Sequence, residues 1–151
     1  MCGISGSGKT AYARRLEKEG YIRLSSDNLI WQKVGADLFR LTKEEQRKLF
    51  AESRLEIISK LKELLTSGKK VVVDATHCKR AGRDAIRNIC NKFSVAPVFL
   101  YCQAEKEELW RRLSQRKGEG PDDLLVTREE LDDYWEGFER PQQDEGDFIE
   151  I

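Results

Sequence analysis

Long hydrophobic runs are missing from this sequence of 151 residues. A transmembrane helix needs about 20 consecutive apolar residues, so the sequence excludes a helical membrane span. Met1 and Cys2 lead directly into a glycine-rich stretch, without the apolar region that a secretory signal has. We therefore expect a cytoplasmic protein with no membrane partner.

Cysteine pairs that bind metal or carry out redox chemistry are missing too. Cys2, Cys78, Cys90 and Cys102 are widely spaced and form no Cys-x-x-Cys motif, which argues against a zinc knuckle or a redox pair. The chain has only three prolines, and no stretch resembles a linker between domains. Since a domain averages about 150 residues, residues 1–151 are expected to form a single domain.

The charges are balanced overall but not along the chain. There are 27 basic and 27 acidic residues, and residues 119–150 hold 13 acidic and 2 basic ones. The other residues therefore carry 14 acidic and 25 basic side chains, a local net charge of +11. A basic body suits an anionic ligand such as a nucleotide or a nucleic acid, although solvated helix faces explain the same pattern.

Segments typical of strands alternate with segments typical of helices. Helices are expected over residues 11–19, 42–67, 79–93, 104–117 and 131–138, and strands over residues 21–24, 71–74, 97–101 and 148–151. Two helices have capping-box residues at their starts, Thr42 with Glu45 and Thr127 with Glu130. This alternation predicts an α/β fold with a mostly parallel sheet flanked by helices.

Residues 3–10 fit the phosphate-binding loop G-x-x-x-x-G-K-[ST], the P-loop of nucleoside triphosphatases. Backbone N–H groups in such a loop point at phosphate oxygens, the lysine reaches the β- and γ-phosphates, and the hydroxyl ligates Mg²⁺. The expected ATP-binding residues are Gly3, Ser5, Gly6, Ser7, Gly8, Lys9 and Thr10. A P-loop normally follows a central strand, so the first strand is expected to be missing or truncated, or replaced by another segment.

The remaining motifs favour a kinase over other P-loop proteins. The sequence argues against a regulatory GTPase, because Asn91-Lys92-Phe93-Ser94 lacks the aspartate that guanine recognition needs. A kinase needs a base for the acceptor hydroxyl, an acid that supports the metal, and cations near the γ-phosphate. Asp27 and Asp74 follow two expected strands at the carboxyl edge of the sheet, and Arg112 and Arg116 are four residues apart on an expected helix.

These motifs, in this order, resemble the kinase domains of polynucleotide 5′-hydroxyl kinases and zeta-toxin-like kinases. The segments that carry the resemblance are residues 3–10, Ser26-Asp27, Val73-Asp74-Ala75-Thr76, Arg112-x-x-x-Arg116 and Phe138-Glu139-Arg140-Pro141-x-x-x-Glu145-Gly146. The resemblance covers nearly the whole chain and implies an adenylate-kinase-like P-loop fold that uses ATP and Mg²⁺.

The resemblance also implies roles for single residues. Asp27 falls at the general base, Asp74 at an acid near the metal, and Arg116 at a lid arginine that contacts the transferring phosphate. Arg112 matches a second lid arginine, and Arg140 falls in the segment near the adenine. Lys9, Asp27 and Arg116 are thus the expected catalytic residues, with Thr10 and Asp74 at the metal.

Two positions depart from this pattern, and each leaves alternatives open. Ile30 stands where the phage polynucleotide kinase has an arginine that holds the nucleic-acid strand, and His77 stands where the family has an asparagine. The acceptor is therefore a polynucleotide 5′-hydroxyl or a small molecule, and a non-catalytic ATP-binding module is the third reading. For single residues, Asp27 can also be a helix cap, Arg111 a surface charge, and His77 a loop or packing residue.

Overall fold

The computed structural model describes residues 1–145 and 148–151. The strands are β1 (Ile22–Ser25), β2 (Val71–Asp74), β3 (Phe99–Tyr101) and β4 (Phe148–Glu150). The α-helices are α1 (Lys9–Lys18), α2 (Ser26–Val34), α3 (Lys43–Thr66), α4 (Arg80–Asn91), α5 (Lys106–Leu113) and α6 (Arg128–Glu136). Three short 3₁₀ helices are η1 (Gly35–Arg40), η2 (Pro121–Asp123) and η3 (Gln143–Glu145). The α/β fold with parallel strands is confirmed.

Two parallel strand pairs lie on either side of Met1 and Cys2. β1 pairs with β2, with Ser25 opposite Asp74, and β3 pairs with β4. The backbone nitrogen of Met1 lies 2.9 Å from the Val73 carbonyl, while Cys2 exchanges hydrogen bonds of 2.8 and 2.9 Å with Leu100 and Cys102. Met1 and Cys2 therefore hold the central place in the order β1, β2, Met1–Cys2, β3, β4. This central place is where the strand before a P-loop normally lies.

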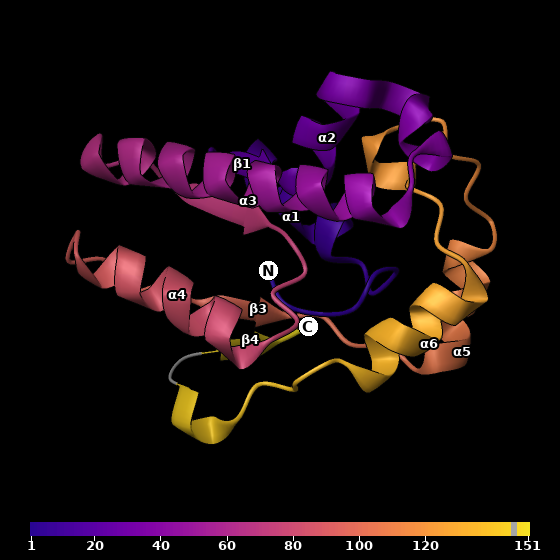
Figure 1. Ribbon diagram of the computed structural model, residues 1–151. Helices are drawn as coiled ribbons and strands as arrows, with labels where there is room; N and C mark the ends of the chain where they lie inside the picture. Colours follow the sequence, from indigo (N-terminus) through magenta and orange to yellow (C-terminus); the bar gives the residue numbers. More distant parts are fainter. Residues whose placement is uncertain (146–147) are drawn as a thin grey trace.

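The helices place their N-terminal ends and the connecting loops at the carboxyl ends of the strands. α1 follows the P-loop, and its Ala13 is fully buried beside Met1, Val72 and Cys102. α3 and α4 pack on β1 and β2 through Leu24, Ile57, Leu61 and partly buried neighbours. α5 and α6 lie on the side towards which β2 and β3 point (Figure 1). The strand ends are therefore surrounded by the P-loop, α2 and the α5–α6 pair.

Capping residues fix two of the helix starts as predicted. In α3 the Thr42 hydroxyl accepts from the Glu45 nitrogen, and the Glu45 carboxylate accepts in return from the Thr42 nitrogen. The same reciprocal pair joins Thr127 and Glu130 at α6. Each pair satisfies two of the N–H groups that a helix leaves without partners at its start.

Two helices differ from expectation. Residues 28–41, for which the sequence predicts neither a helix nor a strand, contain most of α2 and all of η1. Ser25 caps α2 by accepting from the Asn28 nitrogen. α5 was expected to continue to Lys117 but ends at Leu113. Arg116 therefore lies in a turn, and the prediction that Arg112 and Arg116 share a helix face is wrong.

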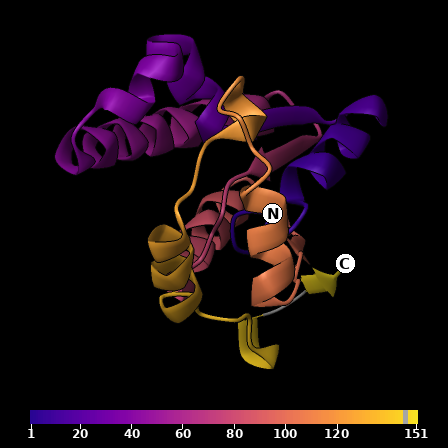
Figure 2. The same ribbon diagram turned by 90° about the vertical axis from the view of Figure 1, so that its right-hand side faces the viewer.

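The segment between α5 and α6 reaches back to α2. Leu124 is buried in one cluster with Ile30 of α2 and Leu38 of η1. Figure 2 shows this segment, in orange, rising from α5 to the level of α2 before it returns to α6. The segment thus forms a cover over the carboxyl end of β1. None of the helices in the described ranges is both long and apolar enough to cross a membrane.

Candidate functional site

The P-loop follows Cys2 as a tight backbone turn that only glycine fits at two points. Gly3 has φ of 137°, and a Cβ atom there would lie 2.3 Å from the Cys102 carbonyl oxygen. Gly8, directly before α1, has φ of 98°, a conformation that side chains rarely adopt. The loop is closed by a hydrogen bond of 3.2 Å from the Ser7 nitrogen to the Ile4 carbonyl. The N-terminal end of α1 therefore opens directly into the loop, which is the arrangement that binds phosphate.

Two buried polar groups in the loop are set up for an anionic ligand. Lys9 is 7% exposed, and its Nζ donates to the Ile4 carbonyl at 2.7 Å. The Ser7 hydroxyl is buried without a hydrogen-bond partner among the described residues. Burial lowers the pKa of Lys9, and the nearby Asp74 carboxylate acts against this shift. A buried ammonium and an unpartnered hydroxyl are both costly, and phosphate oxygens would satisfy both.

Asp27 lies in the first turn of α2, where β1 ends. Ser25 caps the helix, so Asp27 is not the N-cap residue. The Asp27 carboxylate accepts from the Ser26 hydroxyl at 3.3 Å. Burial raises the pKa of Asp27, and the Asp74 carboxylate raises it further, while Lys9 and Arg116 lower it. The structure thus brings Asp27, Asp74, Lys9 and Arg116 into one electrostatic neighbourhood.

Asp74 ends β2 and has partners on both carboxylate oxygens. The Thr10 hydroxyl lies 3.4 Å from Oδ1, and Arg23 of β1 contacts Oδ2 through Nη2 at 2.7 Å. Arg23 also pairs at 2.7 Å with Asp122 of η2, which Arg14 of α1 contacts in turn. Asp74 is 5% exposed, so Arg23 supplies the positive charge that its burial requires.

Thr10 and Asp74 fit a magnesium ion. A hydroxyl and a carboxylate are hard oxygen ligands, and Mg²⁺ is usually held by one or two such groups together with substrate phosphates and water. When bound, the ion would neutralise negative charge on the phosphates. Asp74 Oδ1 faces Thr10 and has no cation on it, whereas Arg23 holds Oδ2.

The three arginines of the α5 region differ in their contacts. Arg112 donates to the Gly6 carbonyl of the P-loop at 3.1 Å. Arg116 is partly buried and donates to the Leu124 carbonyl at 2.9 Å, and burial lowers its pKa. Arg111 is 60% exposed, and among the described residues its side chain pairs with Glu108 alone, a partner that it shares with Arg112. Arg112 and Arg116 therefore face the site, and Arg111 behaves as a surface charge.

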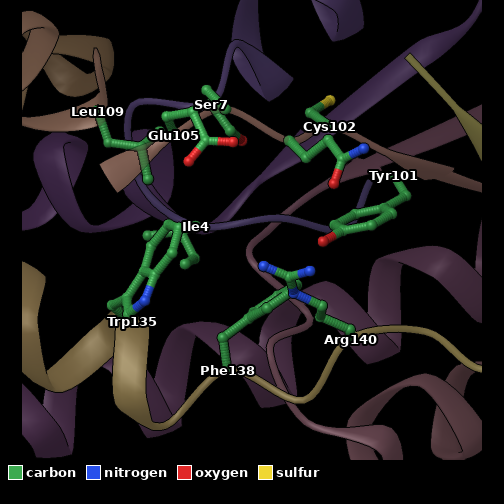
Figure 3. Close-up of a pocket in the computed structure, with 11 residues that line it drawn as sticks. Ile4, Ser7, Tyr101, Cys102, Glu105, Leu109, Trp135, Phe138 and Arg140 are labelled. Atoms are coloured by element: carbon green, nitrogen blue, oxygen red, sulfur yellow. The ribbon is translucent and has the colours of Figure 1, made fainter. Parts of the chain in front are cut away.

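A pocket of about 380 Å³ lies beside the P-loop. Ile4 and Ser7 line one side, residues 101–105 after β3 another, and Trp135, Phe138 and Arg140 the third. Figure 3 shows the Arg140 guanidinium directed into this space, near the Tyr101 ring. The Tyr101 and Phe138 rings stack with centroids 5.8 Å apart. The pocket joins the P-loop to Arg140, the residue predicted near the adenine; Gly146, from the same motif, lies outside the described residues.

A buried ion pair holds the segment that carries Arg140, and sequence reasoning did not identify it. Arg83 of α4 and Glu145 are both fully buried, and Arg83 Nε and Nη2 each lie 2.7 Å from a Glu145 oxygen. Arg83 also donates to the carbonyls of His77 and Glu139. No local pattern predicts this pair, because its members are 62 residues apart.

His77 has a packing role in the loop after β2. Its Nδ1 lies 2.9 Å from the Met1 carbonyl, and its ring meets the Phe99 ring edge-on at 6.3 Å. Burial lowers the pKa of His77 to about 4, so the ring is neutral at neutral pH. This geometry supports the packing alternative for His77.

Solved structures with the same fold include several proteins named as kinases. A nominal kinase from Chloroflexus aurantiacus j-10-fl has a TM-score of 0.76 and 17% identity, covering 99% of this chain and 85% of its own. A gluconokinase from Sinorhizobium meliloti 1021 has a TM-score of 0.65 and 22% identity, with 99% and 79% covered. Chaetomium thermophilum Kti12, in complex with ADP-AlF3, has a TM-score of 0.68 and 14% identity, with 99% and 86% covered.

At such low identities these likenesses show the fold alone. No curated protein sequence matches the chain. A family model, described as AAA domain, matches residues 1–141 and so includes the P-loop, Asp27, Asp74 and the α5–α6 segment. The chain therefore belongs to this AAA domain family and has the P-loop kinase fold.

Proposed function

We propose that residues 1–151 form one kinase domain that transfers the γ-phosphate of ATP to the hydroxyl group of an acceptor. The observation that carries this proposal is the convergence of Lys9 and Arg116 on Asp27, since the charges of both residues act on the Asp27 carboxylate beside the P-loop. A P-loop alone indicates a nucleotide and not a reaction. A carboxylate base beside it is what a transfer to an alcohol additionally needs.

Each of these residues has a defined task in the proposed reaction. The acceptor oxygen forms a bond to the γ-phosphorus while the bond from that phosphorus to the β-phosphate oxygen breaks, and ADP leaves. Asp27 takes the hydroxyl proton; its raised pKa makes it a stronger base than an ordinary aspartate. Lys9 and Arg116 stabilise negative charge on the phosphoryl oxygens, and Thr10 and Asp74 would hold Mg²⁺.

The pocket beside the P-loop supports ATP as the donor. It combines apolar side chains, such as Ile4 and Phe138, with the polar groups of Ser7 and Arg140, as nucleotide pockets commonly do. The adenine would lie against the Phe138 ring with Arg140 beside it. Arg112, which contacts the Gly6 carbonyl, is placed to approach the phosphates.

The acceptor we propose first is the 5′-hydroxyl of a polynucleotide, because the motifs resemble polynucleotide kinases in order and spacing. A small-molecule alcohol is the second candidate, and one observation favours it. Ile30 is 0% exposed and packs with Leu38 and Leu124, so no charged group can hold a nucleic-acid strand from that position. The names of two similar structures, a gluconokinase and a sugar kinase, agree with this second candidate.

Transfer of label from γ-labelled ATP tests both candidates. The acceptors are a 5′-hydroxyl oligonucleotide, the same oligonucleotide with a 5′-phosphate, gluconate, glucose and a nucleoside. We expect label in one hydroxyl acceptor, loss of transfer in Lys9→Ala, and unchanged transfer in Lys18→Ala, an exposed residue of the same helix. If the wild-type protein binds ATP but labels none of them, and Asp27→Asn hydrolyses ATP as fast as the wild type, the non-catalytic module is the better description.

A further inference from the structure

Helix α3 has one side that the fold does not use for packing. Its buried residues Ile57 and Leu61 pack against Leu24 of β1, and Ser53 is buried one turn before them. On one flank of this buried stripe, Glu56 pairs with Lys33 of α2 at 3.1 Å. Arg47, Phe50 and Arg54 follow one another at helical spacings of three and four residues along the opposite flank. We call these three residues the α3 face.

Contacts at neighbouring residues show where the α3 face is directed. Lys43, one turn before Arg47, forms an ion pair with Glu130 of α6. Arg54, farther along, is close enough to His77 for its positive charge to lower the pKa of that ring. The α3 face therefore looks towards α6 at one end and towards the loop after β2 at the other. Figure 1 shows α6 beside the N-terminal end of α3.

The side of α6 that meets this region leads to the proposed base. Tyr134 is four residues after Glu130 and so shares its helix face. Burial raises the pKa of Tyr134, and the charges of Glu130, Cys78 and Asp27 contribute to the shift. Tyr134 thus lies on the side of α6 that meets α3 through the Lys43–Glu130 pair, and the Asp27 charge, which would deprotonate the acceptor hydroxyl, acts on it.

The positive charges of the α3 face favour the binding of an anion. Arg47 and Arg54 are exposed, and neither forms an ion pair within the described ranges. Glu130, on the side of α6 that meets α3, is already paired with Lys43. Phe50 is 36% exposed and Tyr134 is 42% exposed, so two aromatic rings accompany the two guanidinium groups. A guanidinium binds phosphate or carboxylate through two parallel N–H bonds, and its geometry favours such oxyanions over neutral groups.

We propose that the α3 face binds an anionic group of the acceptor while the acceptor hydroxyl reaches Asp27. The acceptor is then an alcohol that also carries a phosphate or a carboxylate, and a neutral alcohol is a poor substrate. This inference rests on the proposed kinase function, and it assigns the acceptor side of the same site. A 5′-hydroxyl oligonucleotide and gluconate share this chemistry, whereas a nucleoside and glucose lack it.

Direct binding tests the inference without turnover. Each acceptor is titrated into the protein saturated with a non-hydrolysable ATP analogue. We expect the oligonucleotide to bind at least about tenfold more tightly than the nucleoside, or gluconate about tenfold more tightly than glucose. Arg47→Ala and Arg54→Ala should each lower the affinity for the anionic acceptor by about tenfold. The affinity of both variants for the ATP analogue should stay within twofold of wild type. Lys60→Ala, which removes a cation on the Glu56 flank of α3, is the control and should leave acceptor affinity unchanged.

The oligonucleotide and gluconate should differ in how their affinities depend on salt concentration. If the oligonucleotide binds, each arginine removed should reduce the slope of log affinity against log salt by about 0.7, because each phosphate contact on a single strand releases that share of counterion. Gluconate, with one charge, should show only a shallow slope. Equal affinity for neutral and anionic acceptors, no binding of either anion, or unchanged affinity in both arginine variants would overturn the inference. Arginine-dependent binding without phosphoryl transfer would instead count against the kinase function alone.

Discussion

Arg23 of β1 holds Asp74 of β2 across two adjacent parallel strands. Nη2 and Nε of Arg23 lie 2.7 and 2.8 Å from Oδ2 of Asp74, and both side chains are less than a tenth exposed. The same guanidinium reaches Asp122 in the segment between α5 and α6. One arginine thus fixes the acid of the proposed metal site and anchors the cover above it.

Removing Arg23 should destabilise the protein strongly. Arg23→Ala leaves the Asp74 carboxylate buried without its ion-pair partner, which typically costs about 3–5 kcal/mol of unfolding free energy. Arg14→Ala also breaks a contact to Asp122, but Arg14 is 59% exposed, so its loss should cost less than about 1 kcal/mol. Urea unfolding of both variants measures the difference. Equal effects of the two variants would mean that Asp74 does not need Arg23 for its charge.

Asp27 should control both the rate and its dependence on pH. Asp27→Asn is expected to lower kcat by about 10²–10⁴ with little change in ATP affinity, because a base is lost and no phosphate contact is. The base must be unprotonated, so the wild-type rate falls as the pH drops through the pKa of Asp27. Since that pKa is raised above 3.8, the fall should begin at a higher pH than for an ordinary aspartate.

The pH–rate profile checks this assignment. The acid limb should be present in the wild type and absent in Asp27→Asn. In Ser26→Ala the limb should shift to a slightly higher pH, because the Ser26 hydroxyl hydrogen-bonds the charged form of Asp27 and so lowers its pKa. An unchanged kcat in Asp27→Asn would remove Asp27 from the mechanism.

Substitutions of Arg116 and Arg111 should differ in their effects on kcat and on the KM for ATP. Arg116→Ala should lower kcat more than it raises the KM for ATP, since a guanidinium over the γ-phosphate acts on charge in the transition state. Arg111→Ala should change neither constant by more than about twofold, because the Arg111 side chain is exposed and pairs with Glu108 of its own helix. Steady-state kinetics with varied ATP compares the pair, and similar losses in both variants would contradict the assignment.

Glu145 should make stability depend on acid pH. Arg83 holds the pKa of Glu145 down to about 2, against 4.5 for an ordinary glutamate. The stabilisation from this pair is therefore complete above pH 4.5 and is lost as the pH falls towards 2. Glu145→Gln should lower the unfolding free energy by about 3–5 kcal/mol at pH 7, where it leaves Arg83 buried and unpaired.

The difference between wild type and Glu145→Gln should shrink as the pH falls from 4.5 towards 2 in urea unfolding experiments. Asp144→Asn is the matched control, because Asp144 is 66% exposed and pairs with the exposed Arg80. Its effect should stay below about 1 kcal/mol. A Glu145→Gln protein as stable as Asp144→Asn would show that the buried pair contributes little.

Local patterns predicted the parts of this fold that depend on neighbouring residues. β2 has the bounds that Val71-Val72-Val73-Asp74 indicates, and both capping boxes form. α2 was missed because Asp27 and Asn28 suggest a loop, while burial of Ile30 against Leu38 and Leu124 decides the structure. Tertiary packing overrides weak local preference there.

The site was predicted only as far as motifs extend. The P-loop residues and the two aspartates could be selected from spacing and from the resemblance, and their catalytic roles stay predictions. Arg23 and Arg83 carry no motif, since Arg23 is 51 residues from Asp74 and Arg83 is 62 from Glu145. Which distant charge meets a buried carboxylate depends on strand register and helix packing.

The α5–α6 pair is tethered at both of its ends. Before α5, the Cys102 nitrogen bonds to the Cys2 carbonyl, and after α6, the Glu139 nitrogen bonds to the Cys78 carbonyl at 2.9 Å, next to the buried Arg83–Glu145 pair. A segment attached at one end can rotate in any direction about that end. A segment attached at both ends, such as the α5–α6 pair, can rotate only about the line that joins the two attachments. Arg112 and Arg116 must then move together on any such tilt, so nucleotide affinity and turnover would respond jointly to changes at either tether.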